Sequence, residues 1–214
     1  MADDRLRTWE TLFRKALQVI DASGEAAIRT EDWSFGGGTV LMRRYRHRYS
    51  KDIDIFVPDP QYLGHLSPRL NDAIEELAPR YIEQAGFVKL YFPEGEIDFI
   101  ASAPLTNPPA LVESVLGREV RVQTSAEIIA RKVYFRGAEF TARDIFDFAL
   151  VIEREPDALP RIEHLLRERR DAILSRIASS DAILRKTFAQ LEVLEFKRSY
   201  RECIAIVKKA LESA

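Results

Sequence analysis

The chain has 214 residues, of which 46% are apolar and 31% charged, and its formal net charge is −2. This length allows one large domain or two small ones with a buried core, and the near-neutral charge excludes an overall basic field of the kind that marks many nucleic-acid-binding proteins. The single cysteine excludes an internal disulfide, no apolar run approaches the roughly 18 residues of a membrane span, and the charged N-terminus is unlike a secretory signal, so we expect a cytoplasmic protein.

The first quarter of the chain contains four expected elements. Apolar residues recur at helical spacing near the N-terminus, which predicts an amphipathic helix over residues 3–22. A short strand over residues 32–35, a short helix over 39–44 and a strand over 51–57 follow. Pro58 ends the last strand, because proline cannot donate to a strand ladder.

Three consecutive glycines, Gly36, Gly37 and Gly38, lie between the expected short strand and the expected short helix. A glycine turn that leads into a helix N-terminus offers free backbone N–H groups and the positive end of the helix dipole, which suits a phosphate. A plain tight turn is the alternative interpretation.

The strand over residues 51–57 carries two carboxylates, Asp52 and Asp54. Successive strand side chains point to opposite faces, so these two share one face while apolar residues fill the other. Two like charges this close repel unless a cation lies between them. Oxygen ligands of this type suit Mg²⁺ or Mn²⁺, and a phosphate site beside a metal pair indicates nucleotide chemistry.

The next elements are a helix and a hairpin. Ser67 and Pro68 favour the start of a helix, and residues 86–101 favour two strands joined by a turn. The expected apolar face of this helix consists of Leu70, Ala73, Ile74 and Leu77. In the second strand Glu96 and Asp98 share one face. Either they line a site or they form the exposed face of an edge strand.

The second half of the chain has a helical pattern. A short strand over residues 120–122 precedes expected helices over 125–135 and 141–154, and the pattern stays helical after Pro156. We therefore expect two parts, an α/β part over residues 1–123 and a helical part over residues 124–214.

Basic residues cluster twice despite the low net charge. One cluster spans residues 43–48, beside the glycine turn, and contacts to phosphate or RNA compete there with a solvated helix face. The second spans residues 161–176, where we favour a solvated face.

Two blocks carry a resemblance to a known family. The first is GGGT followed by RYSKDID, with Arg48, Ser50, Asp52 and Asp54; the second is a helix with Lys132 followed by RDIFD at residues 143–147. This pattern resembles the nucleotidyltransferase superfamily and, more narrowly, its AbiEii/AbiGii toxin branch. The resemblance extends from about residue 33 to residue 150 and implies a polymerase-beta-like core with a small mixed sheet, followed by a helical region.

The resemblance also implies roles for individual residues. A third carboxylate comes from a neighbouring strand in such enzymes, and Asp98 is our candidate, with Glu96 as the substitute. The implied metal ligands are Asp52, Asp54 and Asp98, and the implied catalytic residues are these three with Lys132 and Asp144. The implied nucleotide-binding residues are Gly37, Gly38, Thr39, Arg48, Ser50, Lys132, Arg143 and Asp147.

Local chemistry offers other interpretations for several of these residues. Arg48 could pair with a carboxylate for structural reasons, and Lys132 could be a solvated helix residue. Asp144 stands where an acid caps its own helix. Arg143 and Asp147 are four residues apart and could form a plain surface pair.

The function we expect is transfer of a nucleoside monophosphate from a nucleoside triphosphate to an acceptor, with Mg²⁺ or Mn²⁺. The resemblance implies the toxin of a type IV toxin–antitoxin or abortive phage-infection system, with RNA or tRNA as acceptor and an antitoxin in the same system. One alternative is a small-molecule nucleotidyltransferase of the aminoglycoside-modifying type, which would have an acidic acceptor pocket. The other is an inactive interaction module, which predicts lost carboxylates, whereas Asp52 and Asp54 are present.

Overall fold

The protein is described by a computed structural model that covers residues 5–24 and 27–214. The chain divides into two compact units. Unit 1 comprises residues 1–40, 50–104 and 110–123, and unit 2 comprises residues 41–49, 105–109 and 124–214. Two short segments of the first half therefore belong to the mainly helical unit.

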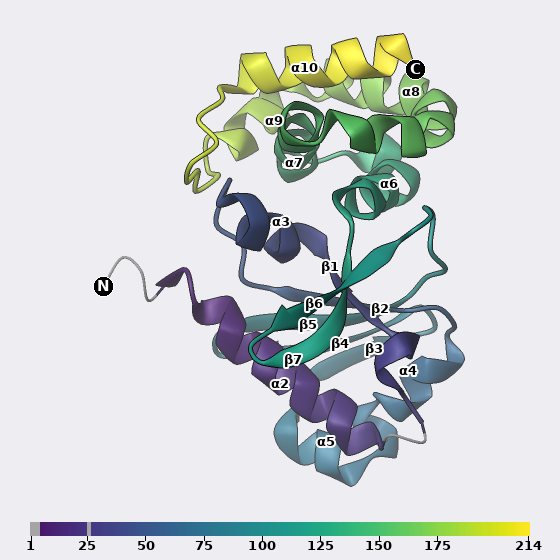
Figure 1. Ribbon diagram of the computed structural model, residues 1–214. Coiled ribbons are helices and arrows are strands. Elements are labelled where there is room, and N and C mark those ends of the chain that lie inside the picture. The colour runs from purple at the N-terminus through teal and green to yellow at the C-terminus, as the bar shows by residue number, and fades with distance from the viewer. Residues whose placement is uncertain (1–4, 25–26) are drawn as a thin grey trace. The chain divides into compact units, whose positions relative to one another are not determined.

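Unit 1 is built on a seven-stranded mixed sheet with the strand order β3-β4-β5-β2-β1-β7-β6 (Figure 1). The strands β2 and β5 pair in parallel, as do β1 and β7, and the other neighbours are antiparallel. This arrangement confirms the α/β class with a mixed sheet. The strand bounds are Ser34–Gly36 for β1, Ile53–Val57 for β2, Tyr81–Gln84 for β3, Phe87–Phe92 for β4, Gly95–Ala101 for β5, Ala110–Val115 for β6 and Arg118–Gln123 for β7.

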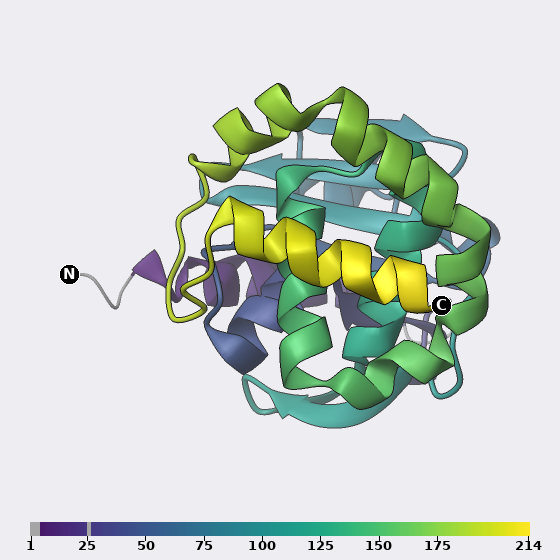
Figure 2. The same ribbon diagram turned by 90° about the horizontal axis from the view of Figure 1, so that it is seen from above.

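Unit 2 consists mainly of helices, as the pattern of the second half predicts. In Figure 2 the last helix, α10, crosses over α7, and it also contacts α8. Capping boxes at Thr141 and Ser199 fix the starts of α7 and α10. The helix bounds are Ser125–Arg136 for α6, Gly137–Glu139 for η3, Ala142–Arg154 for α7, Pro156–Arg161 for η4, Glu163–Ser179 for α8, Asp181–Phe188 for α9 and Tyr200–Ser213 for α10.

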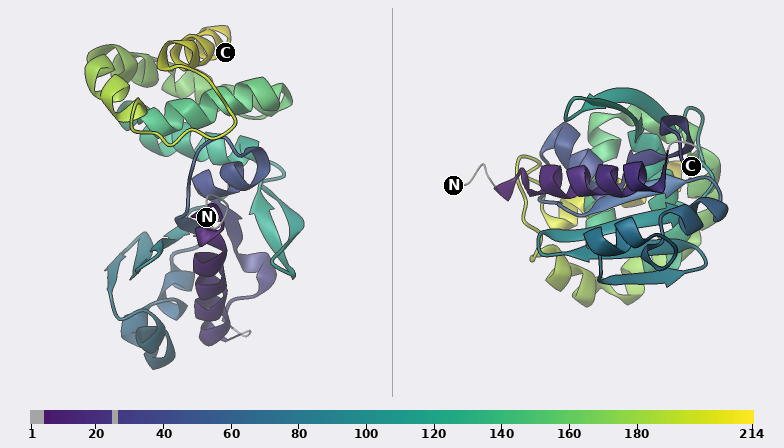
Figure 3. Two further views of the ribbon diagram at one scale, coloured as in Figure 1. Left: turned by 90° about the vertical axis from the view of Figure 1, so that its left-hand side faces the viewer. Right: turned by 90° about the horizontal axis from the view of Figure 1, so that it is seen from below.

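The N-terminal helix α2, Thr8–Ser23, packs on the sheet of unit 1 and contacts β2 and β5 (Figure 3, right). Its apolar stripe buries Trp9 and Phe13 against Phe35 of β1, with the Phe13 and Phe35 ring centroids 4.6 Å apart. The amphipathic pattern therefore predicts the helix correctly, although residues 3 and 4 of the expected range lie outside the described residues.

The remaining helices of the first half are short. α3, Gly37–Tyr45, starts in unit 1 and ends in unit 2. α4 spans Gln61–His65 and α5 spans Asp72–Leu77, with the single-turn helices η1, Thr30–Asp32, and η2, Pro68–Leu70, before β1 and α5. Among the described residues, no helix combines the length and the apolar character that crossing a bilayer requires.

Several expected boundaries differ from the structure. The strand expected over residues 32–35 is β1, shifted toward the glycines, because Asp32 caps the single-turn helix before it. The helix expected from Ser67 is interrupted: the single-turn helix η2 follows Ser67, and α5 begins only at Asp72, where Asn71 accepts the first N–H bonds. Of the expected apolar face, Ile74 is fully buried, whereas Ala73 is exposed and Leu70 and Leu77 are 59% and 39% exposed.

Candidate active site

A row of polar positions crosses the middle of the sheet in unit 1. Gly36 of β1 is paired with Asp54 of β2, Asp54 with Asp98 of β5, and Asp98 with Lys89 of β4. Paired residues of adjacent strands project to the same face, so these side chains share one surface. The opposite face of β2 holds the buried Ile53, Ile55 and Val57. The sheet register thus places Asp98, and not Glu96, beside Asp54.

The glycine turn lies directly against the Asp54 carboxylate. A Cβ atom on Gly37 would lie only 1.8 Å from Asp54 Oδ2, and Gly37 has a φ of +73°, which side chains rarely adopt. Only glycine therefore fits between the start of α3 and this carboxylate. The backbone of Gly37 and Gly38 forms the first turn of α3, where N–H groups have no partner within the helix.

Thr39 and Ser50 tie the turn to the acidic strand. The fully buried Thr39 hydroxyl donates to the carbonyl oxygen of Asp52 at 2.6 Å and lies 3.0 Å from Ser50 Oγ. The Asp52 carboxylate accepts a hydrogen bond from the Glu96 backbone N–H at 3.1 Å. The Thr39 hydroxyl therefore holds the backbone of Asp52 in place, and its one hydrogen, expected to serve a phosphate, is donated to the Asp52 carbonyl. The phosphate role of Ser50 stays a prediction.

Asp98 is a carboxylate of unit 1 whose burial the protein compensates only in part. Burial raises the pKa of Asp98, and the ammonium of Lys89, 3.1 Å from its Oδ2, opposes that shift. The other oxygen, Oδ1, is buried and has no hydrogen-bond partner. Lys89 also pairs with Glu96 at 2.6 Å, and although burial opposes it, these carboxylates raise the pKa of Lys89. A buried carboxylate oxygen without a donor is a position that a cation would satisfy.

The carboxylates of Asp52, Asp54 and Asp98 have the chemistry that a divalent metal requires, although only two of them are adjacent in the sheet register. Asp54 and Asp98 are adjacent in register and supply the hard oxygen donors that Mg²⁺ and Mn²⁺ prefer. Within residues 5–24 and 27–214, no group of three acidic, histidine or cysteine side chains converges in the geometry of a metal site. The structure therefore supports a carboxylate pair, with Asp52 held beside it by its own hydrogen bonds.

Unit 2 contains a second cluster around the fully buried Asp147. Arg48 donates to both carboxylate oxygens at 2.7 Å, and His47 Nε2 lies 2.8 Å from Oδ1. Lys132 Nζ lies 3.2 Å from Oδ2. Burial alone would raise the pKa of Asp147, but Arg48 and Lys132 hold it well below its ordinary value. Burial lowers the pKa of His47.

Lys132 also joins Asp147 to Asp144. Its ammonium lies 2.5 Å from Asp144 Oδ1, and the guanidinium of Arg136 lies 3.2 Å from the same oxygen. The backbone N–H and the hydroxyl of Thr141 donate to Oδ2. Burial opposes the shift, yet Lys132 and Arg136 keep the pKa of Asp144 lowered. Asp144 thus caps α7, as its position predicts, and also pairs with Lys132.

Backbone pairing explains how Arg48 reaches Asp147. The segment 46–49 lies along residues 192–195: Tyr49 N–H donates to the Glu192 carbonyl at 2.8 Å, and Leu194 N–H donates to the His47 carbonyl at 2.9 Å. Arg48 itself forms an isolated bridge with Val193. This pairing places Arg48 of the first motif block in contact with Asp147 of the second block within unit 2.

These contacts decide between the local interpretations left open by the sequence. Arg48 does pair with a carboxylate, and Lys132 is only 11% exposed, so the solvated-lysine interpretation is wrong. The surface pair between Arg143 and Asp147 is also wrong, because Asp147 is buried with Arg48 and Arg143 is exposed. Within the basic run at residues 43–48, His47 and Arg48 are buried, which excludes a wholly solvated face there.

Two polar residues with extensive contacts, Lys89 and Glu127, are not among the candidates that the sequence indicates. Lys89 faces Asp98 across the hairpin, a relation that alternation along residues 87–92 and the hairpin register could have revealed. The fully buried Glu127 accepts hydrogen bonds from the backbone N–H groups of Leu105 and Thr106 and anchors residues 105–109 in unit 2. No local sequence signal indicates the latter contact.

Comparison with known families gives one match that covers most of the chain. Residues 23–205 match the family described as nucleotidyl transferase AbiEii toxin, type IV TA system. No curated protein sequence matches the chain.

Three solved structures with a similar fold are distant in sequence. A candidate nucleotidyltransferase from Helicobacter pylori is 15% identical with a TM-score of 0.54, over 96% of this chain and 92% of that one. The antibiotic-resistance factor ANT(2'')-Ia is 19% identical with a TM-score of 0.51, over 81% and 97%. MenT4, a nucleotidyltransferase toxin from Mycobacterium tuberculosis, is 14% identical with a TM-score of 0.50, over 92% and 82%.

Proposed function

The chain belongs to the AbiEii family of nucleotidyl transferase toxins of type IV toxin–antitoxin systems, and from this membership we propose that it transfers a nucleoside monophosphate from a nucleoside triphosphate to an RNA acceptor such as a tRNA. Its cognate antitoxin acts in the same system.

The observation that carries the proposal is the row formed by the glycine turn, Asp54 and Asp98. The turn leaves no room for a side chain beside Asp54, and Asp98 has a buried oxygen without a partner. A candidate phosphate-binding site made of backbone N–H groups therefore lies next to a pair of carboxylates. Nucleotidyl transfer needs this combination.

In the proposed reaction Asp54 and Asp98 hold the metal, with Asp52 beside them. A divalent cation bound there would polarise the reacting phosphate and neutralise charge that develops on it. The N–H groups of Gly37 and Gly38 orient the triphosphate, and Thr39 and Ser50 support the turn by their mutual contact. Asp98, adjacent to Asp54 in register, is the third carboxylate that we propose helps to activate the attacking hydroxyl.

Charge supports RNA as the acceptor over a cationic small molecule. Unit 2 carries 21 lysine and arginine residues against 15 acidic ones, whereas unit 1 carries 11 against 19. An aminoglycoside-modifying enzyme would require an acidic acceptor region, since its substrate is a polycation, whereas the excess of cations in unit 2 suits a polyanion.

We propose that four residues keep the roles that the resemblance implies and also have a structural role: Arg48, Lys132, Asp144 and Asp147. Arg143 keeps a phosphate-binding role. The ion pairs that Arg48 and Lys132 make with Asp147 and Asp144 support a rigid cluster in unit 2. We propose that this cluster fixes Lys132 for a contact with a nucleotide phosphate, where a compact ammonium is useful.

The test is incubation of the protein with total RNA and each α-labelled nucleoside triphosphate, with Mg²⁺ or Mn²⁺ and with EDTA. We expect label to enter an RNA band only when metal is present, and Asp54→Asn to abolish the transfer without lowering the melting temperature. Asp72→Asn, an exposed carboxylate at the start of α5, is the matched control and should transfer label normally. Equal labelling by Asp54→Asn and the wild type would refute the assignment.

A further inference from the structure

Unit 2 contains a cavity of about 380 Å³ between the end of α6, the start of α7, the end of α8 and α9. Arg136, Arg143 and Arg176 contribute three guanidinium groups to its lining, and Thr187 and Gln190 add polar side chains. None of the described residues that line it is acidic. A cavity with convergent cations and no lining carboxylate selects an anionic ligand.

The three arginines differ in how far the protein itself satisfies them. Arg136 shares Asp144 with Lys132, and Arg176 donates to the Phe140 carbonyl at 3.2 Å and to Ser180 Oγ at 2.7 Å. Arg143, at the exposed start of α7, makes no side-chain hydrogen bond or ion pair with any described residue. A guanidinium of this kind presents a planar set of donors that matches a phosphate.

Exposed aromatic rings precede Arg136 on the same helix. Phe135 is 60% exposed and Tyr134 is 37% exposed, with their ring centroids 4.9 Å apart in an edge-on arrangement. Arg169 lies over the Tyr134 ring at 4.8 Å from its centroid. Aromatic faces flanked by arginines are the means by which proteins bind unpaired bases together with their phosphates.

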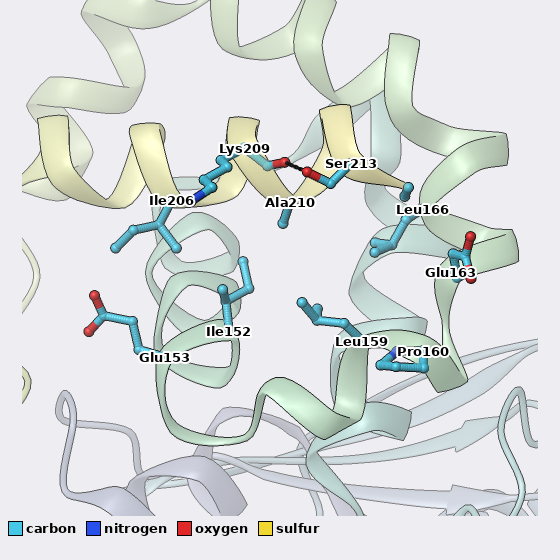
Figure 4. Close-up of a pocket in the computed structure, with 11 residues that line it drawn as sticks. Ile152, Glu153, Leu159, Pro160, Glu163, Leu166, Ile206, Lys209, Ala210 and Ser213 are labelled. Carbon is cyan, nitrogen blue, oxygen red and sulfur yellow. Dashed lines mark hydrogen bonds between the residues drawn. The ribbon is translucent and has the colours of Figure 1, made fainter.

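Another cavity of unit 2 shows that this combination is not a general property of the unit. A space of about 480 Å³ lies between α7, η4, α8 and α10, and Figure 4 shows Ile152, Leu159 and Ile206 around it. Its charged lining residues are Glu153, Glu163 and Lys209, so acids outnumber the cation. That cavity has no preference for an anion.

We propose that the cavity of Arg136, Arg143 and Arg176 binds the phosphate backbone of a single-stranded nucleic acid, and that Phe135 stacks on one of its bases. The inference deepens the proposed function, on which it rests for the identification of this strand with the acceptor. The binding of a single strand is independent of the proposed function, because it requires neither a triphosphate nor a metal.

The experiment is fluorescence anisotropy with a dye-labelled single-stranded RNA of about a dozen nucleotides, a length within the range that such surfaces bind, in EDTA and at several salt concentrations. We expect Arg143→Glu to weaken binding roughly tenfold or more, and Arg143→Ala to lower the slope of log affinity against log salt by about 0.7, the value for one lost phosphate contact. Phe135→Ala should weaken binding about five- to hundredfold through lost stacking.

Matched controls separate this site from charge in general. Arg201→Glu makes the same charge change on the exposed side of α10, and Leu111→Ala trims a 54% exposed apolar residue of β6. Both should bind RNA like the wild type. The proposal is overturned if the wild type binds no single-stranded RNA, or if Arg201→Glu and Arg143→Glu lose affinity equally.

A final comparison distinguishes the source of the phosphate. If Arg143→Glu keeps its RNA affinity but loses affinity for a nucleoside triphosphate in Mg²⁺, the pocket serves the triphosphate and the strand assignment is wrong. RNA binding that depends on Arg143, in a chain that transfers no nucleotide, would instead contradict the proposed function and leave this inference standing.

Discussion

At the scale of single residues, Asp98 stands in an unfavourable position that a bound cation would relieve. Its carboxylate is largely buried, one of its oxygens has no donor, and Lys89 compensates the other oxygen. Because burial raises the pKa of Asp98, the contribution of this group to folding is favourable at low pH and is lost as the pH rises through the raised value. Carboxylates with pKa values that burial has shifted are found preferentially at functional sites.

Asp98→Asn should therefore separate metal binding from folding. Without metal at neutral pH, we expect the variant to melt at or above the wild-type temperature, because the charge that burial disfavours is gone while Glu96 still pairs with Lys89 at 2.6 Å. With Mg²⁺ or Mn²⁺ at about a hundred times the dissociation constant, the wild type should gain roughly 5 °C or more and the variant nothing. Differential scanning fluorimetry measures both. A variant that melts far below the wild type would identify the contact between Asp98 and Lys89 as structural.

Asp147 is the opposite case, a buried carboxylate that its neighbours fully compensate. Asp147→Asn leaves Arg48 and part of Lys132 without a counter-charge in the interior, which should lower the free energy of unfolding by about 3–5 kcal/mol. Urea denaturation gives this number. The control is Asp171→Asn, whose side chain is 91% exposed and which should change stability by no more than about 0.5 kcal/mol.

The same cluster predicts a pH dependence with a defined sign. The pKa of Asp147 lies well below its ordinary value of 3.8 in the folded protein, so its ionised form contributes stability above that value. This contribution is lost as the pH falls through the lowered pKa. The difference in unfolding free energy between the wild type and Asp147→Asn should shrink as the pH falls below about 4. A difference that still grows below about pH 4 would contradict the charged cluster.

At the scale of elements, the turn from β1 to α3 has the sharpest steric requirement. Gly37→Ala adds a methyl group 1.8 Å from Asp54 Oδ2 at a positive φ, so Asp54 or the turn must move. Gly117→Ala is the matched control, since Gly117 has a φ of +83° and nothing within 4 Å of the position that its new methyl group would take. Both variants should lose about 1–2 kcal/mol from backbone strain. Only Gly37→Ala should lose metal-dependent triphosphate binding, measured by calorimetric titration; equal affinities would place the phosphates elsewhere.

The elements also show what the sequence can and cannot predict. The apolar alternation of β2 and the capping signal before α7 depend on neighbours in the chain, so both are predicted from sequence alone. The sequence does not predict β6, because this strand is mostly exposed. Its consecutive residues Leu111 and Val112 are both exposed, so it lacks an alternating pattern. The pairing of Arg48 with Asp147 joins residues 99 positions apart, and nothing local specifies it.

At the scale of the whole molecule, the two motif blocks fall into different chemical settings. The carboxylate row and the glycine turn belong to unit 1, which has more acids than bases, and the cluster of Lys132, Asp144 and Asp147 belongs to unit 2, which has more bases than acids. A net charge of −2 conceals this division, because the two excesses nearly cancel. Composition alone therefore underestimates how well part of the chain suits a polyanion.

Family membership makes growth arrest the expected effect of the whole molecule in a cell. Expression without the antitoxin should stop growth, and Asp54→Asn should not, because it removes a charge that we propose binds the metal, while relieving repulsion within the carboxylate row. Asp54 tests this better than Lys132, since Lys132→Ala would also leave two buried carboxylates short of a cation and lower the amount of folded protein. Asp72→Asn, expressed to the same level, should arrest growth like the wild type. If Asp54→Asn arrests growth equally at matched amounts of folded protein, the toxicity comes from something other than nucleotidyl transfer.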